Sequence, residues 1–148
     1  MIGTSAFAGC SQLQYVSLGT ETFIASYAFA GFSLLALYNK ISSIYIPSSC
    51  QLGDGAFAYC PSLTSIMFGS DACFYGVNEL FASTALTRFD FNDAPYSGFD
   101  IPYYKRCFFD CRHLSYVRFP IADGGLDNTF VNCNNLTTII FDDVYTIP

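Results

Sequence analysis

The stretch that decides the fold is Ala56-Phe57-Ala58-Tyr59-Cys60-Pro61-Ser62-Leu63-Thr64-Ser65-Ile66-Met67-Phe68. Its end places two apolar residues, Ile66 and Phe68, on either side of one outward position, and this period of two predicts a short, half-buried strand. The same order returns with the same spacing: a Phe, a Cys three residues later, then a Leu and two strand positions. The matching copies are anchored by Phe7, Phe57, Phe108 and Phe130. A motif that returns in one register indicates an internal repeat.

Two further copies depart from this spacing. The second, anchored by Phe29, keeps Phe32 in the Cys position but inserts six residues, 35–40, before Ile41. The fourth, anchored by Phe81, is one residue short and has no Cys. Successive anchors lie 22, 28, 24, 27 and 22 residues apart. These lengths fit the roughly 20–29 residues of a leucine-rich repeat.

Each repeat offers one short strand and cannot bury its own apolar face, so successive coils must stack to form a continuous core. Stacked strands form a parallel sheet with neighbours about 4.8 Å apart. The residue after the strand is often Gly or Pro, as at Gly19, Pro47, Gly69 and Pro120, and it turns the chain. The anchoring Phe residues then fill the coil from the opposite wall. We expect them to be buried and stacked in one row, and the insertion to bulge outward.

Two stretches are close to the consensus of a known family, namely Ile2-Gly3-Thr4-Ser5-Ala6-Phe7-Ala8-Gly9-Cys10 and Ile44-Tyr45-Ile46-Pro47-Ser48-Ser49. On these motifs the chain closely resembles the BspA-like leucine-rich repeat family over nearly its whole length. The resemblance implies a β-rich solenoid: a right-handed coil of about six irregular repeats of 22–28 residues with a parallel sheet on its concave face. It also implies a cell-surface or secreted protein that adheres to host proteins, matrix or other cells.

The repeats run through residues 1–148 as a single leucine-rich repeat domain. The chain opens inside one repeat, at Ile2-Gly3, and stops inside another, at Tyr145-Thr146-Ile147-Pro148. The ends of a repeat stack need polar caps, and none is recognisable here. We therefore expect a fragment of a longer repeat protein, or a chain whose ends pair with something else.

Composition excludes several classes of protein. The chain is 52% hydrophobic and 18% aromatic with only 12% charged residues, which excludes intrinsic disorder. A net charge of −6 leaves no basic stripe for nucleic acid or for an anionic membrane surface. No apolar run approaches the roughly 20 residues of a membrane span. No signal peptide begins at Met1, so a surface location requires a signal or anchor outside this chain.

The cysteines are interpreted as structural. Those that share one repeat position facing the core are Cys10, Cys60, Cys111 and Cys133. A free Cys there acts as a small hydrophobic residue, and a Cys111–Cys133 disulfide is the easiest alternative because adjacent coils bring equivalent positions together. Cys107, Cys111 and His113 are too few for a structural zinc site, which needs four ligands. We predict no metal and no cofactor.

No catalytic constellation is visible. His113 is the only histidine, and no nucleophile or orienting group accompanies it in sequence. The acidic residues of 90–93 and 142–143 do not form an EF-hand-like calcium loop. Phosphate-binding glycine loops are absent. The sequence therefore favours a binding protein over an enzyme.

The informative surface is the outward side of the strands, where Tyr, Arg and Met are the types enriched in protein interfaces. Strand propensity alone also favours Tyr there. The predicted protein-binding residues on the concave face are Tyr15, Tyr45, Met67, Arg88, Asp90, Tyr116 and Arg118. Arg88 and Asp90 lie on the same side of one strand, where they can pair with each other and weaken Arg88 as an anchor.

Two functions remain open at this point. The leading hypothesis is a surface or secreted adhesion module whose partner is a host, matrix or cell-surface protein. The alternative is an intracellular scaffold, which the apparently reduced thiols favour because disulfides persist in oxidising compartments. The identity of the ligand and the oligomeric state do not follow from the pattern.

Overall fold

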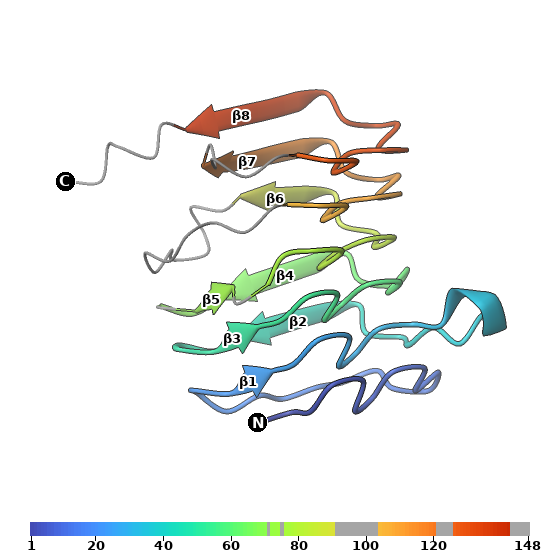
Figure 1. The fold of residues 1–148 in the computed structure, drawn as a ribbon, viewed down its shortest axis with the longest axis vertical. Coiled ribbons are helices and arrows are strands. Elements are labelled where there is room, and N and C mark those ends of the chain that lie inside the picture. The colour runs from blue at the N-terminus through green and yellow to red at the C-terminus, as the bar shows by residue number, and fades with distance from the viewer. Residues whose placement is uncertain (71, 75, 91–103, 121–125, 143–148) are drawn as a thin grey trace.

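The computed structural model describes residues 1–70, 72–74, 76–90, 104–120 and 126–142. The coils stack one upon the next along a single axis, from the N-terminal coil at one end to the C-terminal coil at the other (Figure 1). All paired strands are parallel, and the one helix in the described part is a single 3-10 turn, η1, Ser33–Leu35. The prediction of a β-rich repeat fold with parallel strands is confirmed.

The predicted strands form one side of the stack, which we call the strand wall. They are β2 Ser43–Ile46, β4 Ser65–Phe68, β6 Arg88–Asp90, β7 Tyr116–Pro120 and β8 Thr138–Asp142. Equivalent repeat positions lie side by side, as in Ile44 beside Ile66 and Phe89 beside Val117. The repeat register read from the sequence is therefore the register of the strands.

The expectation of one continuous parallel sheet was wrong. Within the described residues the strand wall is two sheets, β2-β4 and β6-β7-β8, with no pairing between β4 and β6. The break falls at the fourth copy, which reaches its strand one residue sooner than its neighbours. The first copy contributes no strand, and Val16 and Leu18 pack half-buried against the core without one. Its neighbour carries the insertion, and a backbone bond from Lys40 N–H to Leu13 C=O of 2.7 Å joins the two coils there.

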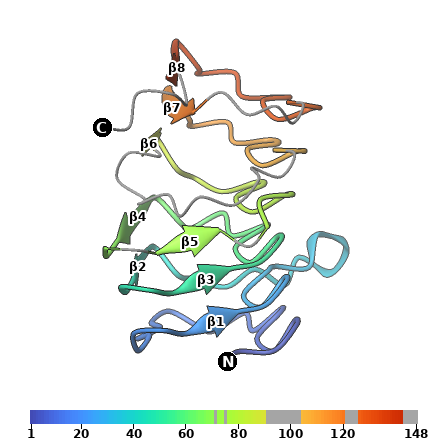
Figure 2. The same cartoon turned by 60° about the vertical axis from the view of Figure 1, so that its left-hand side comes forward.

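A second side of the stack holds a sheet that the sequence did not predict. Its strands are β1 Phe23–Ile24, β3 Gln51–Leu52 and β5 Cys73–Phe74, paired in the order β1-β3-β5 (Figure 2). Ile24 and Leu52 are fully buried and in register, and a bridge from Ile2 to Ile24 continues the ladder. Two-residue strands are too short to display a period of two, so no alternation could reveal them.

The third side, which we call the turn wall, carries the row of anchoring Phe rings. Successive rings are stacked with centroids 5.4, 5.5, 6.5, 5.9 and 5.9 Å apart along the row Phe7, Phe29, Phe57, Phe81, Phe108 and Phe130. This confirms the predicted row. Burial is complete only for the four inner rings, which are at most 1% exposed. Phe7 is 41% exposed and Phe130 is half-buried, because each lies at an end of the row of anchoring rings.

Backbone hydrogen bonds join the coils along the turn wall. The N–H of each anchoring Phe donates to the residue before the next anchor, as from Phe29 to Ala56 (3.0 Å) and from Phe57 to Leu80 (3.2 Å). The residues two before and two after an anchor often take positive φ, as Glu79 (53°) and Tyr59 (56°) do. Such angles are uncommon outside glycine and cost roughly 1–2 kcal/mol. The ladder and the ring stack therefore hold the turns in a conformation that isolated turns would leave.

The insertion bulges from the stack, as predicted (Figure 1). Phe32 bridges back to Leu37, and the 3-10 turn between them leaves Leu34 98% exposed. The expectation that Phe32 occupies the Cys position was wrong, since its side chain is 49% exposed. Asn39 takes that place at the end of the insertion, where an amide can bond the backbone as a phenyl ring cannot.

Polar side chains in the Cys position bond the carbonyl of an anchoring Phe. The thiols of Cys60, Cys111 and Cys133 donate to the anchors of the preceding coils, at 3.3, 3.0 and 3.0 Å. Asn39 Nδ2 donates to Phe29 O at 2.7 Å, and Thr84 Oγ1 donates to Phe81 O at 2.9 Å. Asn39 and Thr84 thus bond the anchor of their own coil, and the Cys of the next coil bonds the same carbonyl from the other side of the repeat boundary.

Replacing Phe57 by Ala should lower the free energy of unfolding by about 3–5 kcal/mol, because the ring is fully buried in the middle of the row. Phe7→Ala serves as the matched control and should cost clearly less, since that ring is already 41% exposed. Urea unfolding followed by circular dichroism measures both. Equal losses would contradict the burial of the row.

Replacing Asn39 by Ala should lower the free energy of unfolding by about 1–3 kcal/mol, because it leaves the buried N–H of Ile41 without its acceptor, Asn39 Oδ1 at 3.2 Å. It also removes one of the two donors to Phe29 O, which the Cys60 thiol still bonds at 3.3 Å. Leu34→Ser, at the exposed tip of the same insertion, should change it by less than about 0.5 kcal/mol. Similar losses in the two variants would show that the insertion is structural throughout.

Candidate functional site

The strand wall presents two of the predicted residues side by side near its N-terminal end. Tyr45 on β2 and Met67 on β4 are register partners, and they are 51% and 58% exposed. Gly69 follows β4 and leaves room for the ring, since a Cβ at this position would stand 2.8 Å from the Tyr45 hydroxyl oxygen. The pair forms an exposed apolar and aromatic patch on a rigid strand surface.

The other predicted residues gather on β6 and β7. Arg88 is the register partner of Tyr116, and its guanidinium carbon lies 4.8 Å from the centre of that ring. Arg88 Nη2 also bonds Asp90 Oδ2 at 3.1 Å, so the predicted pairing of these two residues is confirmed. Asp90 is in turn the register partner of Arg118. Arg88, Asp90 and Arg118 therefore form a cluster of two cations and one anion beside the Tyr116 ring.

Two predicted residues do not lie as expected. Asp90 is buried, with its side chain only 8% exposed, because it turns into the ion pair with Arg88 while Arg88 itself stays 56% exposed. Asp90 therefore positions Arg88 and offers little contact surface of its own. Tyr15 is 88% exposed, but it lies outside every strand, in the first copy whose strand does not form. The regular ladder does not hold it beside the other residues.

The remaining residues form two patches on the strand wall. Tyr45 and Met67 belong to the sheet β2-β4, whereas Arg88, Tyr116 and Arg118 belong to β6-β7-β8. The second patch continues onto β8, where Thr138 and Ile140 are exposed beside Tyr116 and Arg118. A partner that touched both patches would lie across the break between β4 and β6.

The buried cysteines of the core are poor nucleophiles. All seven are free, and Cys50, Cys60, Cys107 and Cys111 are buried. Burial raises the pKa of the Cys60 thiol to about 12, although bonds from Asn39 and the backbone oppose this shift. Burial likewise raises the pKa of Cys133 to about 12 and that of Cys107 well above its ordinary value. A thiol that stays protonated is a poor nucleophile and a poor metal ligand.

His113 is exposed, and none of the hydrogen bonds among the described residues involves it. Nor do any three His, Cys, Asp or Glu side chains in that part of the chain lie close enough to share a metal ion. The described residues also contain no helix of the length and hydrophobicity that crossing a bilayer requires. The stack thus presents surfaces rather than an assembled catalytic centre.

The fold and its exposed strand wall are those of a leucine-rich repeat protein. The model of the BspA type leucine-rich repeat region matches in six copies, over residues 1–100 and 36–148. Together these ranges cover the whole chain, which therefore belongs to this family. No match was found among curated proteins or among solved structures. Repeats of this class generally mediate protein–protein interaction and are typically non-enzymatic.

One group of surface residues was missed by the sequence analysis. Tyr38, Tyr59 and Arg112 come from three different repeats, yet they line one hollow. No periodicity joins them, because the hollow also takes Thr84 and Ala85 from the fourth repeat, so that both irregular repeats, the second and the fourth, contribute to it. The signal that could have found the hollow is the departure from the repeat itself, at the insertion and at the shortened copy.

Raising the pH from about 8.5, the ordinary pKa of a Cys, toward 12 should destabilise the protein. Over this pH range the Cys60 thiol loses its proton in the unfolded chain but keeps it in the folded protein. Rising pH therefore stabilises the unfolded state relative to the folded state, and the free energy of unfolding falls. Cys60→Ala should therefore lose less melting temperature than the wild type between these pH values. Ser62→Ala, which removes no titrating group, is the control and should match the wild-type slope. Identical slopes for all three proteins would contradict the assignment.

Proposed function

We propose that residues 1–148 are one repeat domain that binds a partner protein through the strand wall, at the cell surface or outside the cell. The partner would be a host, matrix or cell-surface protein. The observation that carries this proposal is the register of Arg88 over Tyr116 with Asp90 fixing Arg88 from below. Aromatic and Arg side chains held rigid on a sheet are the residue types of binding hot spots.

The chemistry of the two patches supports contact with protein rather than with nucleic acid. Tyr45 and Met67 supply exposed apolar area, and Tyr116 and Arg118 border the exposed Ile140. The chain carries twelve acidic and six basic residues, so a phosphate backbone would be repelled. A protein surface with apolar residues and mixed charge is the complementary partner.

The alternative is an intracellular scaffold that uses the same strand wall. Seven free cysteines favour it, since exposed thiols are oxidised outside the cell. Four of them are buried, however, and burial protects a thiol in either compartment. Titrating the free thiols of protein isolated from its natural source, with localisation of the full-length protein by microscopy, separates the two locations.

The double variant Tyr45→Ala, Tyr116→Ala should remain folded and lose attachment to cells or matrix. Tyr45 points outward, and Tyr116 is half-buried against Arg88 rather than in the core. The measurement is adhesion of protein-coated beads to cultured cells and to matrix, with soluble protein as competitor. We expect the wild type to compete and the double variant to fail by about tenfold or more, since hot-spot residues are each worth about 2 kcal/mol.

Gln51→Ala provides the matched control, because Gln51 is an exposed strand residue on the wall formed by β1, β3 and β5. It should compete as well as the wild type. A folded double variant that competes fully would remove the site from the strand wall. Failure of Gln51→Ala alone would move the site to the second wall.

A further inference from the structure

The two irregular repeats meet at one hollow of about 420 Å³ on the surface. Tyr38 comes from the insertion in the second coil, and Thr84 and Ala85 come from the shortened stretch of the fourth. In the third and fifth coils the Cys lies three residues before the following Leu, as Cys60 does before Leu63. In the fourth coil Thr84 lies only two residues before Leu86. The hollow lies beside this shortened stretch of the fourth coil. Its volume is that of an ordinary ligand site.

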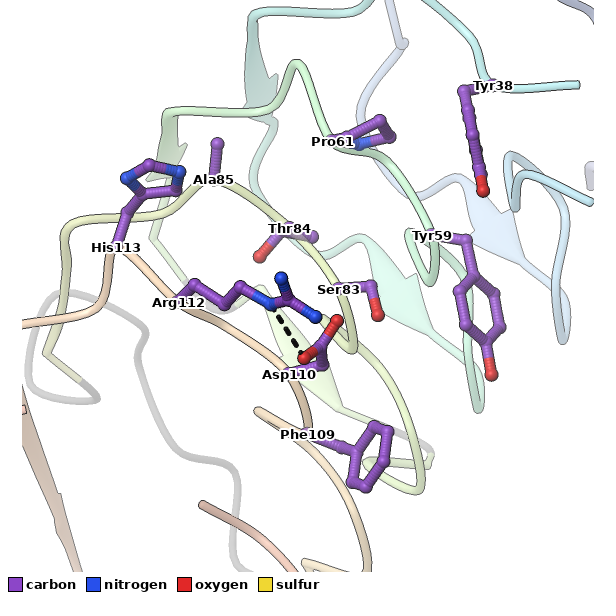
Figure 3. A pocket seen from close by; sticks show the side chains of 10 residues that line it. All are labelled: Tyr38, Tyr59, Pro61, Ser83, Thr84, Ala85, Phe109, Asp110, Arg112 and His113. Carbon is purple, nitrogen blue, oxygen red and sulfur yellow. Dashed lines mark hydrogen bonds and ion pairs between the residues drawn. The ribbon is translucent and has the colours of Figure 1, made fainter. Parts of the chain in front are cut away.

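One side of the hollow is apolar and aromatic. Its lining there includes Tyr38, Tyr59 and Pro61. Figure 3 shows Tyr38 and Tyr59 on one side, with Arg112 and His113 facing them from the other. Tyr59 is held by the turn wall, since its N–H donates to Ala82 O at 2.7 Å. These rings offer flat faces to an apolar ligand group.

The other side of the hollow carries the ion pair of Arg112 with Asp110, with His113 beside it. Arg112 Nε donates to Asp110 Oδ1 at 3.0 Å, which fixes the guanidinium in place. Among the described residues its two terminal nitrogens have no hydrogen-bond partner, and the side chain is 66% exposed. Those two nitrogens form a fork that fits a carboxylate. Arg112 is the cation that this side of the hollow offers to an acidic group, through the two terminal nitrogens that Asp110 leaves open.

We propose that this hollow binds an extended, proline-containing segment of a partner protein through one acidic side chain. That carboxylate pairs with the terminal nitrogens of Arg112, and the neighbouring prolines lie on Tyr59, Tyr38 and Pro61. An extended proline-rich segment has no internal hydrogen bonds and little conformational freedom to lose, so aromatic grooves suit it. Its unpaired carbonyls can accept from the hydroxyls of Ser83 and Tyr59. This site is separate from the strand wall and stands without the function proposed for that wall.

The test uses three fluorescein-labelled decapeptides and the 148-residue chain, with binding followed by fluorescence anisotropy. The first peptide is proline with one central aspartate, the second replaces the aspartate by asparagine, and the third places the aspartate among glycine and serine. We expect the first to bind about tenfold more tightly than either control, the change that one charge-assisted hydrogen bond supplies. Equal binding of the three peptides, or no binding up to about 1 mM, would overturn the proposal.

Two variants place the binding in the hollow. Arg112→Gln should weaken the aspartate peptide about tenfold and make it equal to the asparagine peptide. Ala85→Phe should fill the recess of the short coil and weaken both proline peptides. Circular dichroism melts check that each variant is folded. If Ala85→Phe does not fold, the result for Arg112→Gln alone tests whether the peptide binds in the hollow.

Lys105→Gln is the matched control, since it removes the same charge from an exposed residue outside the hollow. It should bind all three peptides as the wild type does. A loss equal to that of Arg112→Gln would mean unspecific attraction between opposite charges and would overturn the proposal. Peptide binding that disappears in Tyr45→Ala, Tyr116→Ala and persists in Arg112→Gln would assign the peptide to the strand wall instead.

Discussion

The stacking of one coil's turn on the next is the constraint on which the rest of the structure depends. Each anchoring Phe joins its neighbour twice, through ring contacts of 5.4 to 6.5 Å and through a backbone bond beside the ring. Buried ring pairs add about 0.5–1.5 kcal/mol beyond the area they remove from water. Because the bonds run between coils, no single repeat can keep its turns in the left-handed conformation seen at Tyr59 or Glu79. Order in one coil therefore depends on order in the next.

Because the turn wall holds the coils together, the outward residues of the strand wall are available to bind a partner. Ile44, Ile66 and Val117 face the core and keep the register, whereas Tyr45, Met67 and Tyr116 face outward with no part in it. Outward residues can change without disturbing the stack. The irregular repeats affect the surface in another way, because a change of length in one coil alters how it meets its neighbours. The hollow beside Arg112 is lined by residues of both irregular repeats, the insertion of the second and the shortened stretch of the fourth.

The sequence predicted those features that recur with a fixed spacing. The Phe row, the strand register around Ile66 and the outward bulge of the insertion all follow from repeated positions, so each copy supports the others. Pairing of Arg88 with Asp90 followed from the period of two. What failed depended on a single copy: the burial of Asp90, the missing strand beside Tyr15, and the replacement of Phe32 by Asn39. The two-residue strands β1, β3 and β5 carry too little pattern to be recognised, and the hollow joins residues that no period relates.

The break between β4 and β6 has a mechanical consequence. On the strand wall no backbone pairing crosses it among the described residues, whereas on the turn wall the bonds from Phe57 to Leu80 and from Tyr59 to Ala82 do. At this level the coils are joined by backbone bonds on the turn wall, whereas on the strand wall they are joined by side chains, such as Phe68 of β4 against Phe89 of β6 with ring centroids 6.0 Å apart. Tension along the long axis of the stack would concentrate at the break between β4 and β6. The two halves would then separate on the strand wall and hinge about the turn wall. A partner bound across the strand wall would hold the two halves together and make the whole stack stiffer.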